Sequence, residues 1–389
     1  LIEVNFHNRI FGMNPPTILE ENWQTLLGLL PFNWREMARD YGAVRRLRGI
    51  RDEETLLRLL LLHVARGFSL RETVAIARNA KLASISDVAL LNRLRSSEQW
   101  LWAMCKSLFL ENAQGGPATV ALEDVHFKSV DGSIIREPGK TGSQWALHYS
   151  LRLPSLECDE FTLRPAKGKE ARGESFKNFA VQKGDCLIGD RVYANAPGIH
   201  YVADRGGHVL VRVNTGALYF QDTDGKDFDL LKQVRTLRVA GQSNEWEVQI
   251  AHPEGESKKA LAGRVIVVRK TQVAADQAKK KLKRNASKKQ YDLKPETLEY
   301  ANYVIIFTDL SAARLSSAQA FAWYRLRWQI ELFFKRFKSL ANAGHLPKRD
   351  DSSARSWLYG KLLVCLLAEK LTRQARDFSP WGCELQAAP

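Results

Sequence analysis

The chain has 389 residues, of which 45% are hydrophobic and 26% charged, and these values predict a globular protein of two or three domains. No apolar run approaches the roughly 20 residues of a membrane-spanning helix, and no secretory signal is recognisable, so we expect a soluble, cytoplasmic protein. The five cysteines form no C-x-x-C pair and the histidines no H-x-x-H pattern. This argues against a disulfide framework and against a histidine/cysteine metal site.

The charge balance is strongly basic. Lysine and arginine number 58 against 43 acidic residues, which gives a formal net charge of +15. Such an excess attracts polyanions, and nucleic acid is the commonest of them. The alternative is charge that only keeps the protein in solution. The composition therefore favours a nucleic-acid partner before any motif is considered.

Residues 1–112 predict a helical domain. A capping-box pattern at Ser69 opens one helix, and Ser86 is the expected N-cap of the next. Two helices joined by a short break are similar to a helix-turn-helix, and Arg93 and Arg95 lie on the second helix. An ordinary helical hairpin has the same pattern, so DNA binding by these arginines is a hypothesis at this stage.

After a glycine-rich break, residues 118–215 predict an α/β layer. Leu147, Tyr149 and Leu151 alternate with a period of two, which is typical of one face of a strand. We expect strands at 125–130, 145–153, 160–165, 186–189 and 209–213, and a helix at 196–203. Strands that alternate with a helix indicate a mixed sheet.

The next segment, residues 216–300, predicts a β-rich insertion. Seven of the eleven residues from Lys279 to Lys289 are lysine or arginine, and we expect them in a basic loop that is either a DNA contact or simply solvated. Beyond the insertion we expect a core strand at 303–308, a long helix at 316–340 and a final helix at 352–376. The final helix is expected to bury Leu358, Leu362, Leu363, Leu366 and Leu367.

The long helix predicts a face with one carboxylate among cations. At about 100° per residue, Tyr324, Arg327, Glu331, Lys335 and Lys338 fall on one side of it. A carboxylate can hold Mg²⁺, and arginine and lysine can bind phosphate. The alternative is a surface helix with ordinary i,i+4 ion pairs.

Four residues of this face have the spacing of a known signature. Tyr324, Arg327, Glu331 and Lys338 match the YREK motif, so the chain resembles the DDE transposases of insertion-sequence family four over residues 50–370. That family places its first acid in a strand before Gly and Thr or Ser, which here is Asp131.

The family's second acid ends a core strand and is followed by a basic or polar residue, a small residue and an aromatic. The match is Asp190 in Asp190-Arg-Val-Tyr, where Val192 replaces the usual small residue. Asp204 is the competing candidate, but it lies at a predicted helix end. The resemblance therefore implies Asp131, Asp190 and Glu331 as the catalytic and metal-binding residues.

The resemblance also implies a fold, a reaction and partners. The fold is RNase H-like, with a mixed five-stranded sheet and helices, interrupted by the β-rich insertion and preceded by the all-helical domain. The expected segments are 1–112 (DNA-binding helices), 118–215 and 301–345 (the two parts of the catalytic domain), 216–300 (insertion) and 346–389 (C-terminal helical region). Two divalent ions, Mg²⁺ or in its place Mn²⁺, would support cleavage of transposon ends and joining of the 3′-OH to target DNA. A homodimer associated with the bacterial nucleoid would bridge two ends of double-stranded DNA.

Further residues are expected to contact DNA. In relatives an aromatic residue in the strand before the YREK helix stacks on a flipped base, and Tyr303 has the corresponding position. The alternative is a core tyrosine, with Trp246 of the insertion as a second aromatic candidate. The DNA-binding residues expected in all are Tyr324, Arg327, Lys335, Lys338, Tyr303, Arg191, Arg93 and Arg95.

Two other functions remain open on the sequence. A catalytically inactive, transposase-derived DNA-binding protein would keep the basic helices and lose an acid or the YREK face. An RNase H-like nuclease without strand transfer would keep the acids. The sequence retains all three acids and the YREK residues.

Overall fold

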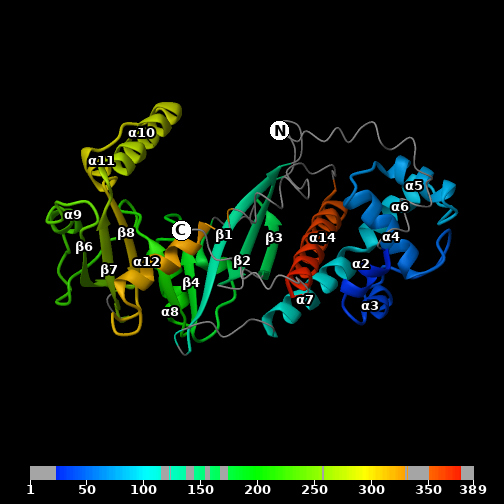
Figure 1. Cartoon of the computed structure of the whole chain (residues 1–389), viewed down its shortest axis with the longest axis horizontal. Coiled ribbons are helices and arrows are strands. Elements are labelled where there is room, and N and C mark those ends of the chain that lie inside the picture. Colours follow the sequence, from blue (N-terminus) through cyan, green and yellow to red (C-terminus); the bar gives the residue numbers. More distant parts are fainter. Residues whose placement is uncertain are drawn as a thin grey trace. The chain divides into compact units, whose positions relative to one another are not determined.

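The computed structural model describes residues 23–114, 122, 124–136, 144–153, 158–166, 174–255, 258–328, 331 and 350–377 (Figure 1). The chain divides into two compact units. The first comprises residues 1–115, 134–145 and 333–389, and the second comprises residues 116–133 and 146–332. None of the helices in the described ranges is long and apolar enough to cross a membrane.

The first unit is helical. Its helices are α2 (Trp23–Leu29), α3 (Trp34–Asp40), α4 (Glu53–Val64), α5 (Leu70–Asn79), α6 (Asp87–Ser96), α7 (Glu98–Gln114) and α14 (Asp351–Asp377). Both predicted caps are present. Ser69 forms a capping box with Glu72, and the Ser86 hydroxyl accepts the N–H of Ala89. The two helices of the predicted hairpin therefore begin where the sequence places them.

The C-terminal helix α14 packs within this same unit against α4, α6 and α7. All five leucines expected to face inward are buried. Two ion pairs accompany the packing, Arg95 with Asp350 at 3.0 Å and Arg355 with Glu98 at 2.8 Å. The first and last expected segments of the chain thus meet in one unit, a pairing that the periodicity of either helix alone does not encode.

The second unit is built on one sheet with the order β3-β2-β1-β4-β5-β8-β7-β6. Its strands are β1 (His126–Arg136), β2 (Gln144–Arg152), β3 (Cys158–Pro165), β4 (Asp185–Gly189), β5 (His208–Arg212), β6 (Ser243–Ile250), β7 (Leu261–Arg269) and β8 (Tyr303–Thr308). β1, β4 and β5 run parallel to one another, and β8 pairs antiparallel with β5. The expectation of a five-stranded sheet was wrong, because β8, β7 and β6 extend the edge of β5 by backbone hydrogen bonds.

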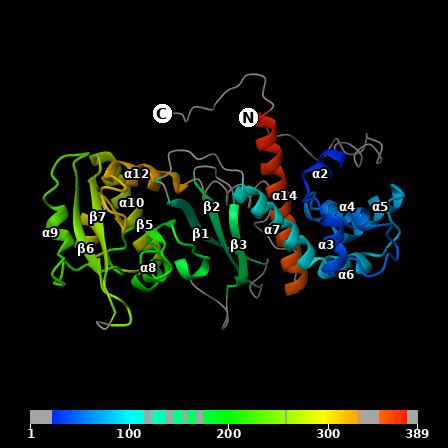
Figure 2. The same cartoon turned by 90° about the horizontal axis from the view of Figure 1, so that it is seen from below.

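Successive residues of the strands point to opposite faces of the sheet and so contribute to two hydrophobic cores, one on each face. On one face Leu187 of β4 packs with η2 (Phe176–Asn178), α8 (Ala196–Ala203) and α9 (Leu230–Val234). On the other face Ile188 packs with α12 (Ser317–Leu326), where Phe127 and Trp323 stack at 4.1 Å. Figure 2 shows α8 and α12 on opposite sides of the strands. Burial on both faces explains why residues 186–189 of β4 form an unbroken run without polar side chains.

The inserted segment is more helical than expected. Its basic run lies in an 18-residue helix, α10 (Gln272–Lys289), so the predicted basic loop was wrong. Thr271 caps the helix, whose alanines and lysines favour helical structure. α11 (Pro295–Tyr300) then leads to β8, and both helices extend from the β6–β8 end of the sheet (Figure 1). The run therefore presents its charges on a rigid element.

Candidate active site

Asp131 and Asp190 lie at the same level of two neighbouring parallel strands. β1 and β4 pair with Ser129 opposite Ile188, and each aspartate follows two residues later, Asp131 within β1 and Asp190 directly after β4. Residues at equal register point to the same side of a sheet, and adjacent strands lie about 4.8 Å apart. The pairing therefore brings together two carboxylates that are far apart in the sequence.

The environment of these carboxylates suits a divalent cation. The N–H of Gly132 donates to Asp131 Oδ1, and that of Val192 donates to Asp190 Oδ1, both at 2.8 Å. Burial raises the pKa of Asp131 to about 6, and the negative charges of Asp190 and Glu331 also raise it. Hard divalent ions prefer carboxylate oxygens as ligands, and their positive charge offsets the repulsion between neighbouring carboxylates. The donor set therefore fits Mg²⁺ or a similar ion.

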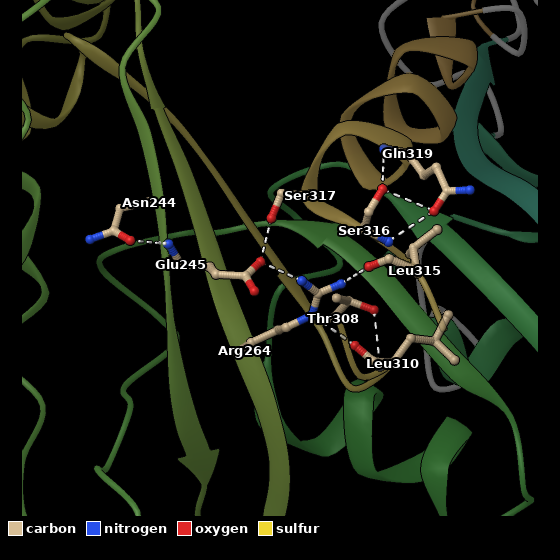
Figure 3. Close-up of polar contacts among 9 residues, drawn as sticks. All are labelled: Asn244, Glu245, Arg264, Thr308, Leu310, Leu315, Ser316, Ser317 and Gln319. Carbon is tan, nitrogen blue, oxygen red and sulfur yellow. Dashed lines mark hydrogen bonds and ion pairs between the residues drawn. The ribbon is translucent and has the colours of Figure 1, made fainter. Parts of the chain in front are cut away.

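A buried arginine anchors the start of α12. Arg264 of β7 is only 4% exposed, and its Nε donates to the carbonyl of Leu310 at 2.9 Å. Its other nitrogens donate to the carbonyl of Leu315 and to the Glu245 carboxylate, which also accepts the Ser317 hydroxyl (Figure 3). These bonds tie the loop before α12 and the first turn of the helix to β6 and β7.

Arg327 and Glu331, which follow α12, lie near Asp131. Arg327 Nη2 donates to Glu331 Oε1 at 2.6 Å, and its guanidinium lies 5.9 Å from the centre of the Tyr324 ring. The charge of Arg327 lowers the pKa of Asp131, whereas that of Glu331 raises it. The Glu331 side chain is 59% exposed, so its ion pair with Arg327 is open to exchange for another partner.

The described part of this helix ends earlier than the predicted one. α12 ends at Leu326, and Trp328 and Glu331 are also helical. Lys335 and Lys338 lie outside the described residues.

Three cations gather near Tyr324. Burial lowers the pKa of Lys270 to about 8, and the positive charges of Arg212 and Arg191 lower it further. Burial and the charge of Arg212 lower the pKa of Arg191, while the charge of Asp190 raises it. Arg212 Nε is buried without a hydrogen-bond partner among the described residues. Like charges held together in this way suit a polyanionic ligand such as a phosphate backbone.

The competing aspartate lies in a different cluster. Asp204 ends α8, is 59% exposed, and lies 3.9 Å from Nε2 of His252. His200 Nε2 is within hydrogen-bonding distance of the carbonyls of Ile250 and Ala251. Asp204, His200 and His252 could together hold a metal ion, which spacing in the sequence did not suggest. These contacts join α8 to the end of β6 and the turn after it. The register of β1 and β4 favours Asp190 as the second acid of the active site.

The predicted base-stacking tyrosine is buried. Tyr303 is 2% exposed within a core cluster, and its hydroxyl accepts a hydrogen bond from Arg269 at 3.0 Å. A base has no access to this ring, so the geometry favours the alternative of a core tyrosine. Trp246 is partly exposed and packs beside Phe228.

The arginines of α6 already have protein partners. Arg93 donates to the carbonyl of Arg46, and Arg95 pairs with Asp350. DNA binding by Arg93 and Arg95 would compete with these bonds.

Three residues near the site were missed by sequence reasoning. Glu174 precedes η2, Arg212 ends β5 and Lys270 follows β7. Burial raises the pKa of Glu174 to about 7, and the charges of Asp131 and Asp190 also raise it. For Arg212 and Lys270, the sequence offered one signal, namely a charged residue at the end of an apolar strand. Glu174 adjoins no apolar strand, so no pattern in the sequence pointed to it.

Comparisons with known proteins identify the family of the chain. The family model for the transposase DDE domain matches residues 165–367. The transposase for insertion sequence element IS421 of Escherichia coli is 32% identical over 367 residues, which cover 92% of this chain and 96% of the relative. The InsL protein for insertion sequence element IS186A of Escherichia coli (strain K12) is 32% identical over 366 residues, with the same coverage. The transposase for IS231F of Bacillus thuringiensis subsp. israelensis is 24% identical over 251 residues, 61% of this chain and 51% of the relative.

The family model matches more than half of this chain, and the alignment with the IS421 transposase covers nearly all of it. This coverage assigns the chain to the DDE transposases of insertion sequences, a family of metal-dependent, DNA-cleaving enzymes.

Proposed function

We propose that this chain is a cut-and-paste transposase in which Asp131, Asp190 and Glu331 hold two divalent ions, Mg²⁺ or in its place Mn²⁺. The observation that carries the proposal is the register of β1 and β4, which puts Asp131 beside Asp190. Glu331 is the third acid, and its negative charge raises the pKa of Asp131. An RNase H-like catalytic core is supported by the strand order β3-β2-β1-β4-β5 with β1, β4 and β5 parallel. In that description β8, β7 and β6 extend the core.

The acids and cations have separate tasks in the reaction. When bound, divalent ions supply activation of water and neutralisation of charge on the phosphate. Asp131, Asp190 and Glu331 hold and orient this site. Water displaces the 3′ oxygen at the transposon end and leaves a 3′-OH. That hydroxyl then attacks a phosphodiester of target DNA, so that one phosphorus–oxygen bond forms and one breaks at each step.

Phosphate binding falls to the cations beside the acids. Arg327 exchanges its partner, Glu331, for a DNA phosphate, which releases the carboxylate for metal binding. Arg191, Arg212 and Lys270 form a second phosphate-binding group, supported by the absence of a partner for Arg212 Nε in the described ranges. These contacts set the register of the DNA and carry little sequence information. Lys335 and Lys338 would extend the same face of the helix.

Recognition of the transposon ends falls to other elements. The hairpin of α5 and α6 would read sequence, with Arg93 and Arg95 in the last turn of α6. The helix α10 would bind the DNA backbone through its exposed lysines. A homodimer would bridge two ends, so that each active site is completed by DNA held partly by the other subunit.

The test is a cleavage assay on duplex DNA that contains the element ends. Wild-type chain and E331Q are incubated with Mg²⁺, and nicked and joined products are separated. We expect cutting by the wild type, loss of cutting in E331Q, and equal DNA binding by the two proteins. Tight binding without cutting by the wild type on correct ends would favour the inactive DNA-binding protein instead. Cutting without joining of a precut end would favour a nuclease.

A further inference from the structure

A cluster of two histidines and one aspartate joins α8 to the end of β6. His200 lies on α8, and Asp204 caps the end of this helix four residues later, so both side chains lie on one face of it. His252 follows β6 and completes the group. A ring nitrogen of each histidine and a carboxylate oxygen of Asp204 lie within 4.8 Å of one another. Three side chains of metal-binding types thus converge from two elements.

The cluster lies at the opposite edge of the sheet from Asp190. β4 and β5 are parallel, so α8 returns from the carboxyl end of β4 to the amino end of β5. Asp190 directly follows β4, whereas Asp204 comes shortly before β5. β6 runs antiparallel to β5, which brings its last residues and His252 to the same edge as Asp204. An ion held there is therefore separate from the ions of the proposed catalytic site.

The hydrogen bonds of His200 prepare its ring for metal binding. The residue is 3% exposed, and Nε2 lies 3.2 Å from the carbonyl oxygen of Ile250 and 3.1 Å from that of Ala251. Because carbonyl oxygens only accept hydrogen bonds, Nε2 carries the ring proton and Nδ1 keeps its lone pair. Histidine ligands of metal ions commonly donate their other ring N–H to a backbone carbonyl in this way.

His252 needs to exchange only one hydrogen bond when a metal ion binds. Its ring is 6% exposed and lies edge-on to that of His200, with centres 4.4 Å apart. The N–H of Glu254 donates to Nδ1 at 3.1 Å, so without metal the ring proton is on Nε2. When Nε2 binds an ion, this proton moves to Nδ1 and the Glu254 N–H turns to water. The Glu254 side chain is 65% exposed and pairs with Lys258 at 2.6 Å, which offsets the lysine charge near the site.

We propose that His200, Asp204 and His252 form a zinc site that fastens α8 to the end of β6. Two imidazoles and one carboxylate suit Zn²⁺, whereas Mg²⁺ prefers oxygen ligands alone. Ligand atoms around tetrahedral Zn²⁺ are about 3.3 Å apart, and water takes the fourth position. The Asp204 side chain is 59% exposed, so it can turn to shorten the 3.9 Å between its Oδ2 and His252 Nε2. Cleavage of DNA with Mg²⁺ alone does not depend on this site, because it lies at the other edge of the sheet.

The experiment titrates Zn²⁺ into the metal-free, full-length chain by calorimetry, with Mg²⁺ in large excess to occupy the carboxylates of the catalytic site. The variants are D204N and H252Q. The matched control is H126Q, because His126 is an exposed histidine at the start of β1. Circular dichroism checks that each variant folds. Because Asp204 is exposed, D204N leaves the core intact and decides the result even if H252Q does not fold.

We expect the wild type to bind one Zn²⁺ at this site, D204N and H252Q to weaken that binding at least about 10-fold, and H126Q to leave it unchanged. Zn²⁺ at about 100 times its dissociation constant should raise the melting temperature of the wild type by about 5 °C, and that of D204N by much less. Wild-type affinity for Zn²⁺ in D204N would overturn the proposal. So would Zn²⁺ binding that excess Mg²⁺ abolishes, because the ion would then lie at the carboxylates. Neither result bears on cutting of end DNA, so the proposed function would stand or fall separately.

Discussion

Two charged clusters of the second unit are organised in opposite ways. Around Arg264 opposite charges meet, since its guanidinium donates to Glu245 and to backbone carbonyls. Around Asp131 like charges meet, since Glu174 and Asp190 add carboxylates to a partly buried region and pKa values rise. A cluster whose charges cancel stabilises the fold, whereas a cluster whose charges repel is relieved by a ligand. Substitutions in the two clusters should therefore separate stability from activity.

The largest effect is expected at the carboxylates. D190N should lower the rate of end cleavage at least about 10³-fold while DNA binding persists, because a neutral amide holds a divalent ion poorly. D204N is the matched control and should cut at nearly the wild-type rate. Gel analysis of cleaved ends measures both. Loss of cutting in D204N together with normal cutting in D190N would reverse the assignment of the second acid.

Next in size is the stability provided by the arginine cluster. R264M should lower the free energy of unfolding by about 3 kcal/mol, because it leaves the Glu245 carboxylate and two carbonyls without their donor. The exposed Arg238 supplies the control, R238M, which should change stability by less than about 0.5 kcal/mol. Urea unfolding followed by circular dichroism measures the difference. Equal stability of the two variants would show that the arginine does not anchor α12.

A smaller effect is expected at the cation group, and it depends on pH. The pKa of Lys270 is about 8, so its positive charge is present below that pH and is lost as pH rises through 8. DNA affinity should fall between pH 7 and pH 9 by more in the wild type than in K270R, which stays charged. K270Q should reduce the slope of log affinity against log salt by about 1. Fluorescence anisotropy with duplex DNA measures these changes, and an unchanged slope in K270Q would remove Lys270 from the phosphate contacts.

The smallest effect is expected for D131N on the melting temperature of the metal-free chain. The pKa of Asp131 rises from 3.8 to about 6 on folding, so the folded chain binds more protons between these values. Stability that is present below about pH 4 is therefore lost as pH rises to about 6. In EDTA at pH 7.5, D131N should melt about 3 °C above the wild type, and this gain should vanish near pH 4. D276N, at an exposed position on α10, should show no such dependence. A gain for D131N that stays constant with pH would argue against repulsion as its cause.

Prediction from sequence succeeded where the signal is local. The capping residues Ser69 and Ser86 placed two helix starts, and the apolar run of residues 303–308 coincides with β8. Prediction from sequence failed where hydrogen bonds formed in the folded protein determine the secondary structure or the pairing of strands. The basic run was expected as a loop because its charges resemble a solvated segment, yet a capped helix forms. The strands of the insertion, β6 and β7, were expected apart from the core sheet, yet they join it at β8.

The sequence by itself determined the family to which this chain belongs, because the YREK spacing and the residues that follow Asp131 and Asp190 are short-range patterns. Only the tertiary structure decided which of these groups meet. The register of β1 and β4 sets Asp131 beside Asp190. The tertiary structure also decided between the two roles left open for Tyr303, because the ring is buried in the core. Spacing along one element follows from backbone geometry, whereas proximity between elements depends on packing and register that no local pattern records.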